Sequence, residues 1–243
     1  CINARVTAGD TIVTAIGTCD SASTPVATLR APALSTCPCT ATVVTGDLVI
    51  DSARMAAAHV CTTAVTGNMT ITEATPEVLH FPALTQVGGD VDFSYAYPAP
   101  AFNGIAYQRR TINAAALTTI GGDVRLYARP QGLNAVTSVG GDITLTLRDT
   151  NPQVLNGLTS VAGSVTIQGP PPSGNLPSGN LDINAGGSFQ ALTTVGGDLT
   201  VRYFYAANGF YPAVQHVGGS VFVGDVRLYP TPSFNALATV AGD

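Results

Sequence analysis

The sequence predicts an all-β fold, a parallel β-solenoid of about nine to ten irregular turns, each of about 22 residues. A phrase that first reads FPALTQVGGDVDF at Phe81 occurs seven times along the chain. Apolar residues at the end of the phrase alternate with polar ones, as in a strand with one buried face. The composition agrees, because 45% hydrophobic residues and a mean hydropathy of +0.28 suit a repeat protein with a continuous apolar interior.

The copies align on the second glycine of the phrase. These glycines are Gly89, Gly122, Gly141, Gly163, Gly197, Gly219 and Gly242, at intervals of 33, 19, 22, 34, 22 and 23 residues. Two weaker copies, VVTGDLVI with Gly46 and AVTGNMTI with Gly67, extend the series towards the N-terminus. One apolar position of the phrase should form a ladder of side chains that point into the core. Exposure of these side chains would overturn the prediction. The members of this inward ladder are Val87, Ile120, Val139, Val161, Val195, Val217 and Val240.

The Gly-Gly pair predicts a corner between two short strands, because glycine tolerates positive φ and close approach of a neighbouring backbone. The aspartates that follow the glycines (Asp90, Asp123, Asp142 and Asp198) are expected to bond to their local backbone as turn residues. Calcium binding is the alternative, but one carboxylate per turn gives too few ligands for a calcium cage. We therefore predict no metal site and no cofactor.

The N-terminal segment, residues 1–40, predicts a Cys-rich cap, and residues 41–243 predict the solenoid. All five cysteines lie in the first quarter of the chain: Cys1, Cys19, Cys37, Cys39 and Cys61. Disulfides that close an irregular cap are favoured over a metal site, because the C-x-C spacing is not followed by a second C-x-x-C pair. The odd count leaves one thiol free, lipid-modified or bonded to another chain. A lipid anchor at Cys1 is the alternative to its pairing within the cap.

The Cys-preceded phrases CPCTATVVTGDLVI and CTTAVTGNMTI, followed by FPALTQVGGDVDF, resemble the receptor L-domain family and its relatives in cell-wall-anchored surface proteins. The resemblance covers residues 37–243. It implies a right-handed β-helix outside the cell that serves for ligand recognition or as a surface protein, without catalytic residues of its own. The chain lacks the Cys-rich module that receptors of this family carry.

Two long insertions, after Phe93 and after Ile167, leave the same strand of the phrase and should emerge at one edge of the solenoid. Tyrosine and arginine in the first insertion and near the C-terminus suit a contact surface. The alternative is that these aromatic residues cover the edge of the protein's own solenoid. The candidate partner-binding residues are Tyr95, Tyr97, Phe102, Tyr107, Arg109, Arg110, Tyr203, Tyr205 and Tyr229.

Several function classes find little support in the sequence. A net charge of −5 without any basic run argues against nucleic acid as a partner, and no apolar run is long enough for a transmembrane segment. Asp92 and Arg125 occupy equivalent positions in successive turns, but no second carboxylate joins them, so we predict no enzyme activity. An ice-binding column of threonines, starting at Thr85 and Thr118, is a minor alternative, because Thr is favoured in exposed strands anyway.

Two functions stay open. The first is a non-catalytic extracellular structural or adhesive surface protein, whose solenoid stacks end to end into a fibre. The second is an L-domain-type module that binds a glycan or a protein through its aromatic and arginine edge. Because the phrase breaks off at Asp243, we expect the solenoid to continue or to dock another subunit beyond that residue.

Overall fold

A computed structural model describes residues 4–7, 10–13, 40–72, 78–93, 111–127, 133–146, 155–168, 189–206, 213–228, 234 and 236–242. The chain divides into two compact units, Cys1–Thr40 and Ala41–Asp243. In the first unit, β1 (Ala4–Thr7) and β2 (Asp10–Val13) form an antiparallel pair.

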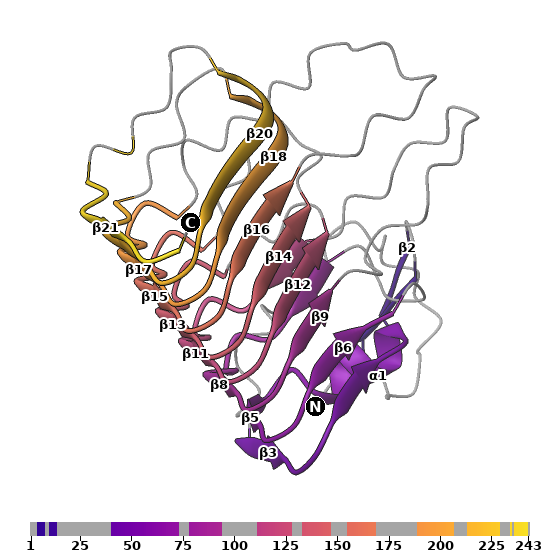
Figure 1. Ribbon diagram of the computed structural model, residues 1–243. Coiled ribbons are helices and arrows are strands. Elements are labelled where there is room, and N and C mark those ends of the chain that lie inside the picture. Colours follow the sequence, from indigo (N-terminus) through magenta and orange to yellow (C-terminus); the bar gives the residue numbers. More distant parts are fainter. Residues whose placement is uncertain are drawn as a thin grey trace, which may run out of the picture. The chain divides into compact units, whose positions relative to one another are not determined.

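The second unit is built from two all-parallel sheets of nine and eight strands, and the chain passes from one sheet to the other within each turn (Figure 1). The sheet of nine contains β3 (Thr42–Val44), β5 (Thr62–Val65), β8 (Gln86–Val87), β11 (Thr119–Ile120), β13 (Ser138–Val139), β15 (Ser160–Val161), β17 (Thr194–Val195), β19 (His216–Val217) and β21 (Thr239–Val240). The sheet of eight contains β4 (Leu48–Ile50), β6 (Met69–Ile71), β9 (Val91–Phe93), β12 (Val124–Tyr127), β14 (Ile143–Thr146), β16 (Val165–Gln168), β18 (Leu199–Ala206) and β20 (Val221–Leu228). This alternation is that of a β-solenoid and confirms the predicted repeat architecture.

A third, smaller parallel pair joins β7 (Val78–His80) to β10 (Thr111–Asn113). Each of these strands leads into a copy of the phrase, at Phe81 and Ala114 respectively. There the backbone turns tightly, because the N–H of Leu84 donates to the carbonyl of Phe81 at 3.2 Å and that of Leu117 to Ala114 at 3.0 Å. The same turn opens the later copies, for example between Leu192 and Phe189 at 3.2 Å.

The inward ladder is buried in six of its seven members. The register pairs each member with the next along the sheet of nine, from Val87 and Ile120 onwards. The exposed fraction of the first six does not exceed 2%, whereas Val240 is 41% exposed. Its strand β21 is the outermost strand of the sheet, so no further strand covers that side of the valine.

The expectation of an all-β chain is wrong at one short helix, α1 (Ala53–Ala58). Its sequence ARMAAA is rich in alanine, the residue with the highest helix propensity. Ser52 caps the helix, since its Oγ accepts from the N–H of Met55 at 3.3 Å. The period-two pattern of the flanking strands gives no sign of this helix, which follows β4 and whose Ala56 joins the core.

Among the described residues, none of the helices is both long and apolar enough to cross a membrane.

Candidate functional site

Most of the predicted aromatic and arginine residues lie outside the described residues: Tyr95, Tyr97, Phe102, Tyr107, Arg109, Arg110 and Tyr229. Tyr203 and Tyr205 belong to β18 by their backbone, and Tyr205 pairs in register with Arg227 of β20. At eight residues each, β18 and β20 are twice as long as the four-residue strands β14 and β16 beside them. The two strands at this edge of the sheet of eight, which include the C-terminal aromatic residues, are therefore longer than the strands beside them.

The corner aspartates form a ladder between turns. The backbone N–H of Asp142 donates to Oδ1 of Asp123 at 2.9 Å, and that of Asp123 donates to Oδ1 of Asp90 at 2.8 Å. The same bond recurs at the other corners, with Asn68 and Ser164 as acceptors in two of them: Asn68 to Asp47, Asp90 to Asn68, Ser164 to Asp142, Asp198 to Ser164 and Ser220 to Asp198. The predicted role in a local turn is thus replaced by a bond to the next turn, and the carboxylate oxygens that accept these bonds serve the scaffold.

A column of threonines along the sheet of nine also joins successive turns by hydrogen bonds. Oγ1 of Thr137 donates to the carbonyl of Thr118 at 3.2 Å, and Oγ1 of Thr159 donates to the carbonyl of Thr137 at 2.9 Å. Thr63, Thr85, Thr118 and Thr193 make the equivalent bonds to the turn before them. The hydroxyl hydrogens of this column are therefore used within the protein.

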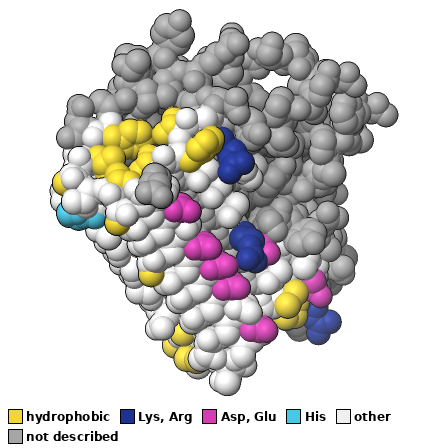
Figure 2. Space-filling model, in the orientation of Figure 1, with side chains coloured by type: hydrophobic (Ala, Val, Ile, Leu, Met, Phe, Trp, Pro, Cys, Tyr) yellow, Lys and Arg dark blue, Asp and Glu magenta, His cyan; other side chains and the backbone are white. Residues whose placement is uncertain are grey.

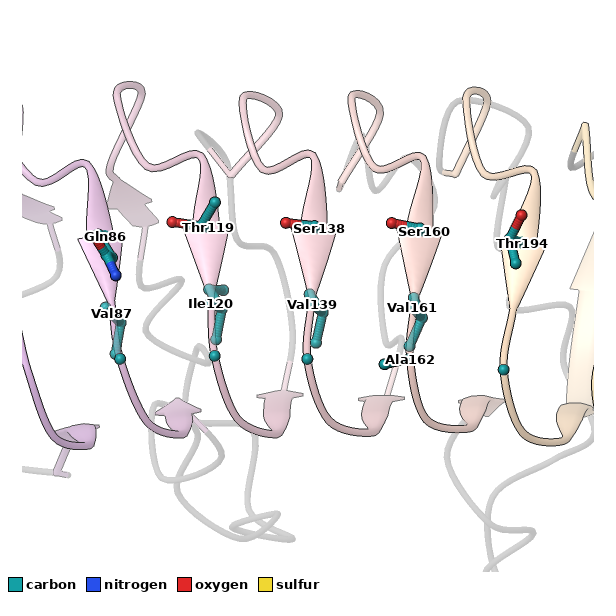
Figure 3. Close-up of a pocket in the computed structure, with 14 residues that line it drawn as sticks. Gln86, Val87, Thr119, Ile120, Ser138, Val139, Ser160, Val161, Ala162 and Thr194 are labelled. Carbon is teal, nitrogen blue, oxygen red and sulfur yellow. The ribbon is translucent and has the colours of Figure 1, made fainter.

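The neighbouring column of small polar residues lines a shallow hollow of about 580 Å³ on the outer side of the sheet of nine. Figure 3 shows Thr119, Ser138, Ser160 and Thr194 in one row on successive strands. These four side chains make no hydrogen bond to any other described side chain or backbone group. The hollow is open, uncharged and, within the described residues, free of aromatic side chains.

The outer side of the sheet of eight carries a different cluster, formed by Phe222 and Gly224 of β20 and Arg202 of β18. Phe222 is 55% exposed, and the guanidinium carbon of Arg202 lies 5.9 Å from the centre of its ring. The ring extends over Gly224, since a Cβ built on that glycine would lie 2.6 Å from Cε1 of Phe222. Figure 2 shows hydrophobic and basic side chains next to each other over β18 and β20. We call these three residues the Phe222 platform. Its only signal in the sequence is that Phe222 occupies the position that threonine holds in the three preceding turns.

Arg125, His59 and His216 each contact a polar group of the scaffold in the described part of the chain. Arg125 pairs in register with Asp92, as the sequence predicted, and its Nη2 contacts Oδ2 of Asp123 at 3.2 Å. Nδ1 of His59 lies 3.2 Å from Oγ1 of Thr62, and Nδ1 of His216 lies 2.8 Å from Oγ1 of Thr239, so both rings bond to hydroxyls of the scaffold. Within the described ranges, His, Cys, Asp and Glu side chains do not gather in threes that could hold a metal ion.

Cys61, the one cysteine among the described residues, is disulfide-bonded. The other disulfide candidates, Cys1, Cys19, Cys37 and Cys39, lie outside the described residues.

Comparison with known proteins gave no match: no family model, no curated protein and no solved structure resembles this chain significantly.

Proposed function

We propose that this chain is a non-catalytic structural or adhesive protein of the cell surface, a right-handed solenoid of the receptor L-domain type that stacks end to end on copies of itself. The observation that carries the proposal is that polar side chains at the corners and in the threonine column bond to a neighbouring turn. Two polar columns that bond successive turns together are typical of a scaffold whose repeats contact chiefly their neighbours.

End-to-end stacking is supported by the last described turn. Val223 occupies an inward position, in register with Val201, but is 42% exposed where Val201 is 3% exposed. Val240, on the outermost strand of the other sheet, is exposed as well. Backbone bonds between turns are nearly identical at each corner, for example 2.9 Å from Gly197 to Gly163 and from Gly219 to Gly197. The last turn therefore offers the same backbone hydrogen-bonding groups as an internal turn. A second copy could cover Val223 and Val240 as the next turn covers their internal equivalents.

An extracellular location is supported by the disulfide at Cys61, because disulfides persist in oxidising compartments. We propose that the segment of residues 1–40 is a cap closed by disulfides among the remaining cysteines. Peptide mapping of the unreduced protein would identify the pairs. A fully reduced set of Cys1, Cys19, Cys37 and Cys39 would contradict the cap.

Electron microscopy of the purified chain tests the structural proposal. We expect filaments of uniform width whose amount rises with protein concentration, and sedimentation velocity should show a matching series of oligomers. Val223→Asp places a charge in the proposed junction and should abolish the filaments. Gln86→Asp serves as the control, since Gln86 is exposed on the outer side of β8, an interior strand of the sheet of nine, away from both ends of the stack. A monomer at all concentrations would refute stacking.

The second candidate function is ligand recognition by an L-domain-type module, and the Phe222 platform favours it. An exposed aromatic ring beside an arginine combines apolar area with hydrogen-bond donors, as binding surfaces often do. The aromatic residues of β18 and of the first insertion remain candidates for the same surface.

A further inference from the structure

We infer that the outer side of the sheet of eight binds an extended, uncharged polysaccharide, with the Phe222 platform as its main contact. The inference rests on the second candidate function above and specifies its site and its class of ligand.

The platform is held in place before any ligand arrives. Gly224 has no side chain, and the ring of Phe222 occupies the space that a Cβ would take. Gly224 is the register partner of Arg202, so the guanidinium reaches the ring from the adjacent strand. A glycine within a strand often marks a place where another group approaches the backbone closely. The ring therefore loses little conformational freedom on binding, which favours affinity.

A track of hydroxyl groups leads up to the ring. Phe222 lies in register with Thr200, which follows Thr166 and Thr144 on the two preceding strands. All three threonines point outwards and are half-buried, and their hydroxyls have no hydrogen-bond partner among the described residues. Neighbouring strands are about 4.8 Å apart, so the track offers one donor and acceptor at each such step.

This combination suits a pyranose chain. One face of a pyranose ring exposes C–H groups that can pack on an aromatic ring, while its hydroxyls point sideways towards polar groups. A protein partner would instead require a broader apolar centre, since the core of a protein interface is depleted of polar residues. Among the described side chains, the outer side of the sheet of eight instead has one aromatic ring, that of Phe222, at the end of a line of threonines.

The charge of the same surface excludes acidic polymers. Asp92 lies in the column that contains the threonines, and the corner column beside it includes Asp123, Asp142 and Asp198. Figure 2 shows acidic side chains in a line along this face of the solenoid. Arg125 lies in the same column but contacts Oδ2 of Asp123, so a polyanion would still be repelled along this line, and Arg202 alone would not compensate for it.

Binding of neutral hexasaccharides (cellohexaose, laminarihexaose and mannohexaose) to the full chain, measured by isothermal titration calorimetry, tests the inference. We expect at least one to bind, and Phe222→Ala to weaken it about tenfold or more, as loss of a central aromatic contact does. Gly224→Ala should also weaken it, because the added Cβ displaces the ring. Hexagalacturonate, which is acidic, should not bind.

Val49→Ala is the matched control, because Val49 occupies the same outward column at the other end of the sheet and is 48% exposed. It should bind like the unaltered chain, and circular dichroism should show all variants folded. The inference is wrong if none of the neutral hexasaccharides binds, if Phe222→Ala leaves binding unchanged, or if Phe222→Ala alters only self-association. Filaments are scored on the same samples, so loss of stacking and loss of glycan binding are seen separately.

Discussion

Oδ1 of Asp123 accepts a hydrogen bond from the backbone N–H of Asp142 at 2.9 Å, across 19 residues of sequence. The backbone N–H of Asp123 in turn bonds to Asp90, 33 residues earlier. The bond is the same although the two intervals differ, because an insertion lengthens one turn without moving the corner. This ladder fixes the register of successive turns and leads to the first prediction.

Asp123→Ala should lower the free energy of unfolding by about 1–2 kcal/mol, because the N–H of Asp142 loses its acceptor. Asp123→Asn keeps an oxygen at the same place, as Asn68 does in its own turn, and should cost less than half as much. Urea denaturation followed by circular dichroism measures both. Equal losses for the two variants would show that the charge, rather than the acceptor, stabilises the corner.

Gly141→Ala should cost about 2 kcal/mol or more, because its Cβ would lie 2.7 Å from the carbonyl carbon of Gly122 and would collide with Oδ1 of Asp123. Ala162→Gly is the control, because this position of the phrase carries a Cβ in its own turn and removing it creates no collision. Thermal unfolding should show a clearly lower Tm for Gly141→Ala, and a larger loss for Ala162→Gly would contradict this account of the corner.

Thr137→Val should destabilise the protein by about 0.5–1 kcal/mol, since Oγ1 no longer donates to the carbonyl of Thr118. Thr137→Ser retains the donor and should lose less. Thr144→Val is the matched control, because the hydroxyl of Thr144 has no described partner and its loss should be nearly neutral. Chemical denaturation of the three variants gives the comparison, and a neutral Thr137→Val would refute a structural role for the threonine column.

Leu145→Ala should cost about 2–5 kcal/mol, because Leu145 is 0% exposed in the continuous core and its loss leaves a cavity. Val49→Ala, at an exposed position of the same sheet, should change stability by no more than about 0.5 kcal/mol. Equilibrium unfolding monitors both variants. Similar effects at the two sites would mean that the core is not packed as described.

The recurring phrase determined the architecture without any structure. Its period-two valines identified the inward ladder, and its glycines placed the corners, because alternation along a strand and the steric freedom of glycine are local properties. Helix α1 was not predicted, because a period-two pattern of apolar residues does not indicate an alanine-rich helix of six residues.

Contacts between turns were decided only by the tertiary structure. The sequence showed that an aspartate follows each glycine pair, but whether Asp123 bonds to its own turn or to the next depends on how the turns stack. Likewise, Phe222 stands out in the sequence, yet its position over Gly224 and near Arg202 depends on the register between β18 and β20. Local chemistry specified the turn, and the stacking of turns determined which side chains became scaffold and which remained exposed.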